Sequence, residues 1–473
     1  MLHSDTNVHS KYSGHAGPIA VPREAAYLIN RLTACGYEAF AVGGCVRDSL
    51  LGKTPNDWDI CTSALPDDMK QCFSGLPVIE TGIKHGTLTV VLEHRPFEIT
   101  TYRIDGEYRD GRHPEQVRFT SDLQADLSRR DFTINAMAYH PGTGLVDPFG
   151  GLQDLQAGII RCVGDAPRRF EEDALRIMRG IRFAAQLGFD IEGKTAGALL
   201  DSRELLDRIS SERIRTEFDK LLCGSGAMDV LAGYRDIVAQ IIPEARPMFD
   251  LDQQNDYHIY TVWDHTLHVI DQIKNTPELK LCAFFHDIGK PEMMTVTEDG
   301  WGHFYRHELA SERIADTVLA RLKYDNRTRE TVTSVVRNHS IVFRPSAKQA
   351  RKLLHKLGEE KLRLLIQLEY ADVKSQNPIY TESRVSTIGA FSQKVDEVLA
   401  SENCFSLRDL AIGGRDLLDL GAAQGPEIGK ILNTLLDMVM EDELPNQRDA
   451  LLDTAIKTFG LHTHTEDTGG RTS

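Results

Sequence analysis

The sequence changes character near residue 160, and this change restricts the folds that are open to the chain. Between residues 22 and 150, β-rich runs such as GTLTVVLE and FEITTYR alternate with helical patterns and are bounded by turn residues. From about residue 161 strand signals nearly vanish, and apolar residues recur at helical spacing. Because 473 residues exceed what one hydrophobic core usually supports, we predict a multidomain protein. Its first domain is α/β, a small mixed sheet with helices, and the domains that follow are all-α.

Changes in composition and the positions of turn-forming residues along the chain predict six segments. A helix is expected from about 211 to 223, where SERIRTEFDKLLC opens with a Ser and an early Glu. The expected segments are a flexible N-terminus (1–21), the α/β domain (22–150), a first helical region (151–245), a helical domain rich in His and Asp (246–380), further helices (381–461) and a disordered tail (462–473).

The overall charge and hydropathy exclude two classes of protein. No apolar run approaches the roughly 20 residues that a membrane span needs, and the N-terminus lacks the pattern of a secretory signal, so we expect a cytoplasmic protein without a membrane partner. The net charge of −16 argues against a generally basic surface for nucleic acid. Nucleic-acid binding would therefore depend on a local concentration of cations, such as the one between Arg161 and Arg182.

The segment AVGGCVRDSLLGKTPNDWDI predicts a strand, a Gly-Gly turn, a helix, a loop and a second strand. Asp57 and Asp59 are two residues apart, so on a strand both side chains point to one face, where they can share hard cations such as Mg²⁺. A third carboxylate usually completes such a site, and Glu98 in the β-rich run PFEITTYR is the candidate. Two Mg²⁺ ions held there would activate a 3′ hydroxyl and stabilise the leaving pyrophosphate.

The Gly-Gly turn suits the binding of a triphosphate. Gly43 and Gly44 let the backbone approach an anion at a helix N-terminus, where N–H groups and the helix dipole favour negative charge. Arg47 lies on the first helical turn and either contacts a phosphate or braces the Asp57 loop. Farther along, Asp173 and Arg176 in EEDALR stand at i and i+3 of an expected helix, where an acceptor and a forked donor can face one base edge together.

Three motifs in one order resemble the tRNA nucleotidyltransferase and class II poly(A) polymerase superfamily: GGCVRDSLLGKTPNDWDI, LSRRDFTINAMAY and IIRCVGDAPRRFEEDALRIMRGIRFAAQLGF, within residues 36–223. The resemblance implies a nucleotidyltransferase head, a helical neck and body over 151–245, and a tRNA-binding region over 381–461. It implies that CTP and ATP are the substrates and tRNA the partner. The nucleotide-binding residues that it implies are Arg130, Asp131 and Asn135 at the sugar and phosphates, and Asp173, Arg176 and Arg179 in the base-selecting motif.

Members of this superfamily add CCA, only CC, only A, or poly(A). The charged loop TYRIDGEYRDGRHPEQVRF carries Arg103, Asp105, Arg109 and Arg112, and the resemblance implies that a loop of this kind accompanies A addition. We therefore favour complete CCA addition. A poly(A) polymerase of the same superfamily remains the alternative.

A second set of residues resembles the HD superfamily of metal-dependent phosphohydrolases. Its six positions occur in the order His265, His286, Asp287, His307, His339 and Asp372. Imidazole and carboxylate together suit transition metals such as Mn, Fe, Ni or Co, and this ligand set is large enough for two ions bridged by Asp287. The resemblance implies hydrolysis of phosphates on RNA 3′ ends or on nucleotides. A metal site kept only for folding is one alternative. Another is an HD phosphohydrolase whose head merely binds nucleotides.

Overall fold

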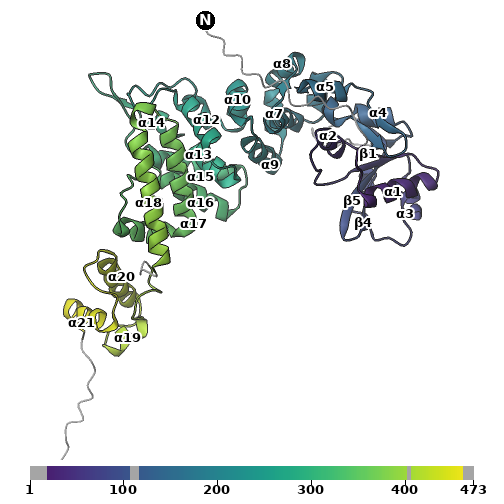
Figure 1. Cartoon of the computed structure of the whole chain (residues 1–473). Helices are drawn as coiled ribbons and strands as arrows, with labels where there is room; N and C mark the ends of the chain where they lie inside the picture. Colours follow the sequence, from purple (N-terminus) through teal and green to yellow (C-terminus); the bar gives the residue numbers. More distant parts are fainter. Residues whose placement is uncertain (1–18, 107–116, 402–405, 462–473) are drawn as a thin grey trace, which may run out of the picture. The chain divides into compact units, whose positions relative to one another are not determined.

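The computed structural model describes residues 19–106, 117–401 and 406–461. Contacts divide the chain into two compact units. The first unit comprises residues 1–246 with 321–324, and the second comprises residues 247–320 with 325–473. The predicted fold class is confirmed, since a mixed sheet lies in the first unit and helices dominate the rest (Figure 1). None of the helices in the described ranges is long and apolar enough to cross a membrane.

The first unit is built on a seven-stranded mixed sheet of order β3-β4-β5-β2-β1-β8-β9. The strands β2 and β5 pair in parallel, with Ile60 opposite Ile99, whereas the other neighbouring strands are antiparallel. A separate antiparallel pair is formed by β6 and β7. The strands are β1 (Ala39–Val42), β2 (Ile60–Thr62), β3 (Val78–Ile79), β4 (Thr87–Leu92), β5 (Arg95–Thr101), β6 (Arg103–Asp105), β7 (Val117–Phe119), β8 (Ala138–His140) and β9 (Gly144–Val146).

Short helices pack against this sheet. The first of them buries Leu28, Ile29 and Leu32, which are spaced as one helical face, against β1 and β2. The helices of this region are α1 (Arg23–Ala34), α2 (Gly44–Leu50), α3 (Pro66–Cys72), α4 (Leu123–Ser128) and α5 (Gly151–Ala157).

The rest of the first unit is helical apart from one short strand pair. The pair joins β10 (Ile159–Ile160) to β11 (Asp190–Ile191) in parallel. The prediction of an all-α region therefore missed these two short strands. The expected helix near 211–223 is α9, and it packs against α7. The helices are α6 (Ala166–Glu172), α7 (Leu175–Leu187), α8 (Gly193–Asp201), α9 (Ser211–Leu222), α10 (Ala227–Gly233) and α11 (Arg235–Ile241).

The second unit is a helical assembly around α13, which buries residues on all its faces. It contacts α12, α16 and α17, while α18 runs alongside α17 (Figure 1). One hairpin, of β12 (Thr295–Val296) and β13 (Gly302–His303), interrupts the helices. The helices are α12 (Val262–Gln272), α13 (Pro277–Phe285), α14 (Lys290–Met293), α15 (His307–Arg321), α16 (Asn326–Asn338), α17 (Ala347–Lys374) and α18 (Glu382–Ala400).

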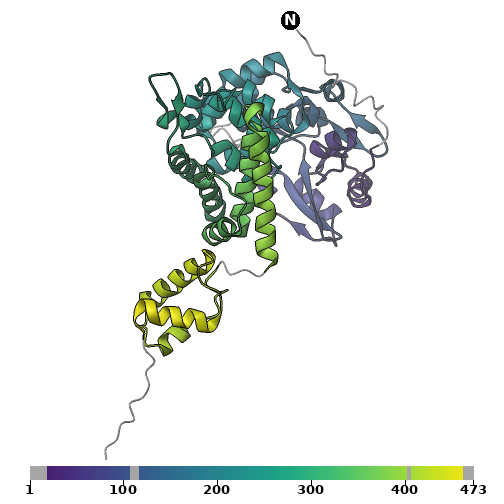
Figure 2. The same ribbon diagram turned by 60° about the vertical axis from the view of Figure 1, so that its left-hand side comes forward.

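Three further helices, α19 (Gly414–Asp419), α20 (Pro426–Met440) and α21 (Arg448–Phe459), pack on one another (Figure 2). Their apolar side chains form a core of their own, centred on Leu417, Leu435 and Leu451.

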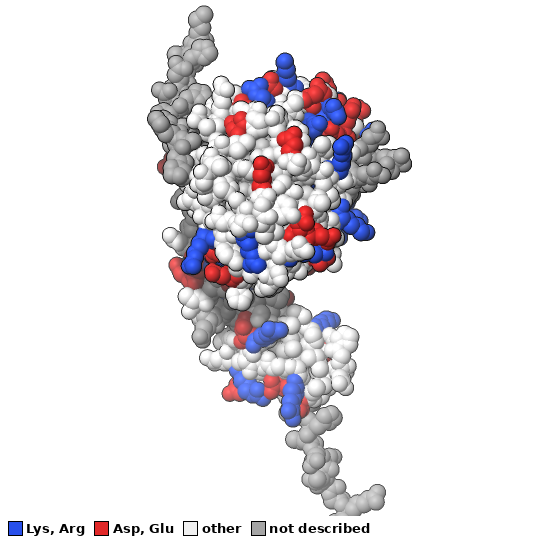
Figure 3. Space-filling view, turned by 90° about the vertical axis from the view of Figure 1, so that its right-hand side faces the viewer, with Lys and Arg blue, Asp and Glu red and all other residues white. Residues whose placement is uncertain are grey.

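On the face of the molecule shown in Figure 3, basic and acidic side chains are intermixed among uncharged ones. The net charge of −16 therefore does not form a single acidic field on that face.

Candidate active sites

Three carboxylates lie on one side of the sheet in the first unit. Asp57 and Asp59 stand in the extended segment that leads into β2, and they are exposed whereas Trp58 between them is buried. This alternation places both carboxylates on one face, as predicted, although the strand itself begins one residue later. Glu98 is the exposed residue of β5 that precedes Ile99, and Ile99 pairs with Ile60. The parallel register therefore brings Glu98 beside Asp59.

The electrostatics of Asp59 reflect this crowding of acids. Desolvation and then the charges of Asp57 and Glu98 raise the pKa of Asp59 to about 6, against the opposite effect of Arg130. The repulsion between such like charges is relieved when a cation binds between them. Oxygen donors are also the ligands that Mg²⁺ and similar hard cations prefer. The donor set thus fits a divalent cation.

The Gly-Gly turn connects β1 to α2 and brings the backbone to this face. Gly43 has a φ of 80°, a conformation that residues with a side chain rarely adopt. A Cβ at Gly43 would lie 3.1 Å from Nη1 of Arg130. Only glycine therefore fits here without displacing Arg130.

Arg47 on α2 braces Asn135 rather than the Asp57 loop. Its Nη1 donates to Oδ1 of Asn135 at 2.7 Å, and its Nε donates to Oδ1 of Asp48 at 2.8 Å. The guanidinium also lies 5.0 Å from the ring centroid of Phe183 on α7. It remains part of the cleft lining and so is still available to a phosphate.

Asp131 links the second motif to α7. Its Oδ2 accepts from Nε of Arg179 at 2.7 Å, and its Oδ1 accepts from Nδ2 of Asn135 at 3.1 Å. Burial alone would raise the pKa of Asp131, but Arg179 and Asn135 outweigh it and hold the pKa well below the usual range. Asp131 is thus a permanent anion that orients two residues of the cleft.

The structure corrects the prediction that Asp173 and Arg176 share a helix face. Asp173 lies in the break between α6 and α7 with extended backbone, at φ −141° and ψ 101°. The Asp173 side chain bonds to the first residue of the next helix, with Oδ1 accepting from the backbone N–H of Leu175 at 3.1 Å. Nη2 of Arg213 on α9 holds Oδ2 of Asp173 at 3.1 Å.

Arg176 is nearly buried and is held by backbone and side-chain acceptors. Its Nη1 donates to Oε2 of Glu172 at 3.0 Å, and its Nη2 donates to the carbonyl of Arg129 at 2.8 Å. The two residues of the base-selecting motif are therefore positioned separately, one by a helix break and one by a hydrogen-bond network. Both still face the same cleft.

One cleft of about 460 Å³ collects these residues. Glu98 is not among the lining residues, and the sequence reasoning missed Arg129, Arg182 and Phe183, which are. Arg182 is held by Glu217 and stacks on the Phe183 ring at 3.6 Å. Arg182 and Phe183 could have been found from the run RGIRF in the third motif, and Arg129 from the run SRRD in the second. The lining comprises Gly43, Gly44, Arg47, Asp57, Asp59, Arg129, Arg130, Asp131, Asn135, Asp173, Arg176, Arg179, Arg182 and Phe183.

The loop expected to accompany A addition is described only at its ends. Arg103 lies in β6, where its Nη1 donates to the carbonyl of His85 at 2.7 Å, and Asp105 ends the same strand. Arg109 and Arg112 lie outside the described residues. Their role in A addition stays a prediction.

The second unit brings together all six residues of the histidine–aspartate cluster, which we define as His265, His286, Asp287, His307, His339 and Asp372. They come from five places along the chain. His265 and Asp372 lie within α12 and α17, His307 begins α15, and His339 follows the end of α16. His286 and Asp287 follow α13, the central helix.

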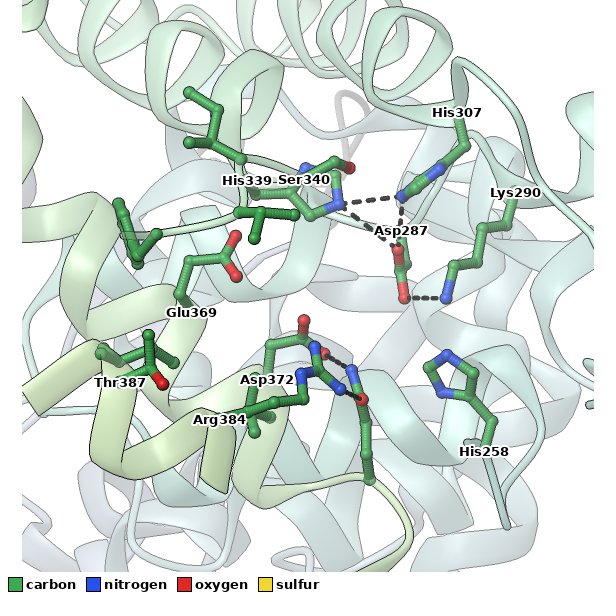
Figure 4. A pocket seen from close by; sticks show the side chains of 16 residues that line it. His258, Asp287, Lys290, His307, His339, Ser340, Glu369, Asp372, Arg384 and Thr387 are labelled. Carbon is green, nitrogen blue, oxygen red and sulfur yellow. Dashed lines mark hydrogen bonds and ion pairs between the residues drawn. The ribbon is translucent and has the colours of Figure 1, made fainter. Parts of the chain in front are cut away.

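Asp287 belongs to both groups of ligand atoms in this cluster, and Figure 4 shows it with His307 and His339 of one group. Its Oδ2 is 3.2 Å from Nε2 of His286 and 3.7 Å from Nε2 of His265. Its Oδ1 is 3.3 Å from Nε2 of His307 and 3.6 Å from Nε2 of His339. His265 is also 2.8 Å from Oδ1 of Asp372. One carboxylate thus faces two groups of ligand atoms.

The hydrogen bonds of the histidines settle which nitrogen faces inward. Nδ1 of His286, His307 and His339 lies 2.7, 2.8 and 2.6 Å from the carbonyls of Ala283, Phe304 and Val336. Since a carbonyl only accepts, each Nδ1 donates, and in the neutral imidazole each Nε2 is then a bare acceptor. Nε2 of His307 and Nε2 of His339 are nevertheless only 3.0 Å apart.

Such a cluster of acceptors fits a metal ion. Nε2 of His286 is buried and has no hydrogen-bond partner among the described residues. Two lone pairs 3.0 Å apart repel one another unless a cation or a proton lies between them. Locking Nδ1 to a backbone carbonyl is the usual way in which a protein orients a metal-binding imidazole. The residues therefore fit a divalent transition metal.

A cavity of about 350 Å³ opens from this cluster. Nζ of Lys290 lies 2.7 Å from Oδ2 of Asp287 at the cluster end. Glu369 and Arg384 line the opposite side (Figure 4). Burial, then Asp372, raises the pKa of Glu369 well above its usual range. Lys290 follows Asp287 by one helical turn and was detectable in the sequence, whereas Arg384 comes from α18, beyond the predicted boundary at 380.

The fold and the first cleft define the class to which the protein belongs. The family "Poly A polymerase head domain" matches residues 39–161, and "Probable RNA and SrmB-binding site of polymerase A" matches residues 188–246. A third family, "tRNA nucleotidyltransferase domain 2 putative", matches residues 294–455. The chain therefore has the head and the following helices of a nucleotidyltransferase.

Whole-length relatives identify the family within this class. The chain is 35% identical to the CCA-adding enzyme of Lactiplantibacillus plantarum, over 90% of this chain and 94% of the relative. It is 34% identical to the CCA-adding enzyme of Enterococcus faecalis, over 92% of this chain and 96% of that relative. The crystal structure of the Bacillus stearothermophilus CCA-adding enzyme in complex with CTP aligns with a TM-score of 0.72 at 28% identity, covering 93% of this chain and 97% of that one. The chain belongs to the family of CCA-adding enzymes.

Proposed function

We propose that this protein adds C, C and A to the 3′ end of tRNA from CTP and ATP, without a nucleic-acid template. The observation that carries the proposal is that Asp57, Asp59, Asp173 and Arg176 all line one cleft. A carboxylate pair suited to phosphoryl transfer and a pair suited to a base edge thus serve one bound nucleotide. The names of the whole-length relatives support the same function.

Asp57, Asp59 and Glu98 would hold the divalent cations, which we take to be Mg²⁺. When bound, such cations activate the attacking 3′ hydroxyl and neutralise the leaving pyrophosphate. The backbone at Gly43 and Gly44, with Arg47 and the other arginines of the cleft, would bind the triphosphate. Asp131 fixes Asn135 and Arg179, and it thereby orients the groups that meet the sugar and phosphates.

Asp173 would select the base. Cytosine and adenine both present an exocyclic amino group, whereas uracil and guanine present a carbonyl oxygen at the corresponding position. A carboxylate accepts from an amino group and repels a carbonyl, so Asp173 favours C and A alike. Arg176 would donate to the adjacent ring nitrogen. The sequence CCA then requires that the growing RNA end changes the shape of this pocket.

Labelled CTP and ATP test this function. The protein is incubated with tRNA that lacks its 3′ CCA, and the products are separated at single-nucleotide resolution. Addition that stops after CCA is the expected result. A ladder of A residues would identify a poly(A) polymerase instead, and no incorporation would leave the head as a nucleotide-binding module.

We propose a second activity, metal-dependent hydrolysis of phosphoesters, for the histidine–aspartate cluster. Bare Nε2 atoms converging on Asp287 favour it, because they would bind two divalent ions such as Mn, Fe, Ni or Co. When bound, these ions supply a nucleophilic hydroxide and polarise the phosphate. Lys290 and Arg384 add positive charge at both ends of the cavity.

Metal content and phosphatase activity test the second proposal separately. The apo protein is reconstituted with each metal, its bound ions are counted, and hydrolysis of p-nitrophenyl phosphate is measured. We expect His339→Ala to lose bound metal and hydrolysis together. His355→Ala, at an exposed histidine of the same unit, serves as the control. Metal binding without hydrolysis of any phosphoester would reduce the cluster to a structural site.

The remaining predicted regions also stay proposals. We assign the nucleotidyltransferase head to residues 22–150 and the neck and body to 151–245. The metal domain is assigned to 246–380 and tRNA binding to the helices of 381–461.

A further inference from the structure

We propose that aromatic side chains beside the histidine–aspartate cavity bind the unpaired bases of a single-stranded nucleic acid. The metal site would then act on a strand end in preference to a free nucleotide. The inference rests on the phosphohydrolase function proposed above, and it names the substrate of that site. Four residues, which we call the aromatic rim, carry it: Tyr257, Trp301, Tyr305 and Tyr380.

The rings of the aromatic rim contact one another or a neighbouring ring. The Tyr257 ring centroid is 4.9 Å from that of Tyr380 and 6.4 Å from that of Trp301. Tyr305 stacks on His303, with centroids 5.1 Å apart and planes 12° apart. These rings come from three segments that are distant in sequence, so the grouping is a product of the fold.

Each segment of the rim is joined directly to the cavity. Tyr257 precedes His258, which lines the cavity, and its carbonyl accepts from the N–H of Asn377, which follows the lining residue Gln376. Tyr305 lies two residues before His307 of the cluster. Phe304, which precedes Tyr305, packs on Nζ of Lys290 at 5.3 Å. A nucleic-acid strand whose terminal phosphate reached the metals would therefore pass beside the rim.

The exposure of the three tyrosines of the rim is unusual for this protein, whereas Trp301 is half-buried. Tyr305, Tyr257 and Tyr380 are 70%, 47% and 38% exposed. Among the described residues only two other tyrosines, Tyr27 and Tyr370, are similarly exposed. Exposed rings gathered at one place indicate a binding surface, because their apolar area would otherwise be buried.

Two arginines, one next to Tyr305 in sequence and one next to the cavity-lining residue Phe343, add positive charge to this surface. Arg306 and Arg344 are exposed, and neither forms an ion pair within the part of the chain that the structure describes. Arg306 follows Tyr305 and has a φ of 64°, a backbone conformation that is costly for a residue with a side chain. Arg344 follows Phe343, which lines the cavity.

Stacking on aromatic rings combined with cations for the phosphates is how proteins bind single strands without regard to sequence. A duplex hides its base faces in the helix, so it cannot use the rings. A free nucleotide that places its phosphate on the metals has no second base for the rim. The combination therefore favours a strand of two or more unpaired nucleotides.

Kinetics on matched substrates test the inference with the full-length, metal-reconstituted protein. The substrates are a single-stranded oligonucleotide with a 3′ phosphate, the same strand in a blunt duplex, and p-nitrophenyl phosphate. We expect Tyr257→Ala and Tyr305→Ala to lower kcat/KM for the single strand by about fivefold or more. Hydrolysis of p-nitrophenyl phosphate should be unchanged. Tyr370→Ala is the matched control, since Tyr370 is 40% exposed and lies outside the rim.

The outcomes separate this inference from the function on which it rests. If Tyr257→Ala and Tyr305→Ala leave kcat/KM for the single strand unchanged, or lower it equally for all substrates, the aromatic rim does not bind the strand. If no phosphoester is hydrolysed, the phosphohydrolase proposal fails, and cross-linking then decides about the rim. A single strand carrying 5-iodouridine should cross-link to peptides that contain Tyr257, Trp301, Tyr305 or Tyr380. Cross-links found only elsewhere would overturn the inference and favour a protein partner for these rings.

Discussion

Asp173 and Asp287 illustrate how single residues obtain their roles in the two sites. The Asp173 carboxylate at the first cleft is held by the N–H of Leu175 at one oxygen and by Arg213 at the other. Asp287 faces two groups of imidazole nitrogens because it follows the central helix of the second unit. In both cases neighbouring groups, and not the carboxylate alone, define the chemistry.

Removing either alternate carboxylate should abolish nucleotide addition. We expect Asp57→Ala and Asp59→Ala each to lower CTP incorporation by roughly three orders of magnitude or more, because the cations supply several kcal/mol of charge stabilisation. Phosphoester hydrolysis by the second unit should persist. Asp67→Asn is the control, at a side chain on α3 that is 93% exposed. Loss of both activities in a folded variant would contradict two separate sites.

Selection of the base should depend on Asp173 and, through it, on Arg213. We expect Asp173→Ala to relax discrimination against UTP and GTP by about tenfold or more, since a good base-edge contact contributes roughly 1–3 kcal/mol. Arg213→Ala should relax it less, because the hydrogen bond from Leu175 to Asp173 remains. Steady-state kcat/KM for the four nucleoside triphosphates measures this. Unchanged discrimination in Asp173→Ala would remove Asp173 from base selection.

At the scale of elements, the turn between β1 and α2 is the most constrained part of the first site. It passes from a buried strand to a short helix in two glycines, and Met137 beside β8 accepts the N–H of Gly43 at 3.2 Å. The two glycines differ in what they tolerate. Only Gly43 has a positive φ, and a Cβ at Gly44 would be 3.8 Å from Nη2 of Arg47, an ordinary contact.

This difference predicts that two adjacent substitutions will affect stability to different extents. Gly43→Ala should lower the free energy of unfolding by about 1–3 kcal/mol and weaken CTP binding, because the backbone is strained and Arg130 is displaced. Gly44→Ala should change the free energy of unfolding by less than about 0.5 kcal/mol. Denaturant unfolding and nucleotide binding measure both. Equal stability of the two variants would show that the turn relaxes freely.

At the scale of the whole molecule, the two sites lie in separate compact units. The carboxylates and arginines of the first cleft all belong to the first unit, and the histidine–aspartate cluster belongs to the second. A ligand of one site should therefore stabilise its own unit.

Metal binding tests this independence. Adding Mn²⁺ or Ni²⁺ at 100 times its Kd should stabilise the second unit by about 2.7 kcal/mol, seen as a shift of one thermal transition. His286→Ala should lose that shift and still incorporate CTP. A His286→Ala variant that is folded but inactive toward CTP would show that the units are coupled.

The order of motifs, the alternation of Asp57 and Asp59, and the helical periodicity after residue 160 could all be read from the sequence, because they depend on residues close to one another along the chain. Lys290 was readable for the same reason. The break at Asp173 and its contact with Arg213 were not, since the helical pattern continues through residue 173 and Arg213 lies 40 residues away. Arg384 and the rings of the aromatic rim likewise meet through packing of segments far apart in sequence. The sequence alone determined which chemical groups the chain has and in what order. Only the tertiary structure decided which of them share a site, because long-range contacts depend on how whole helices pack.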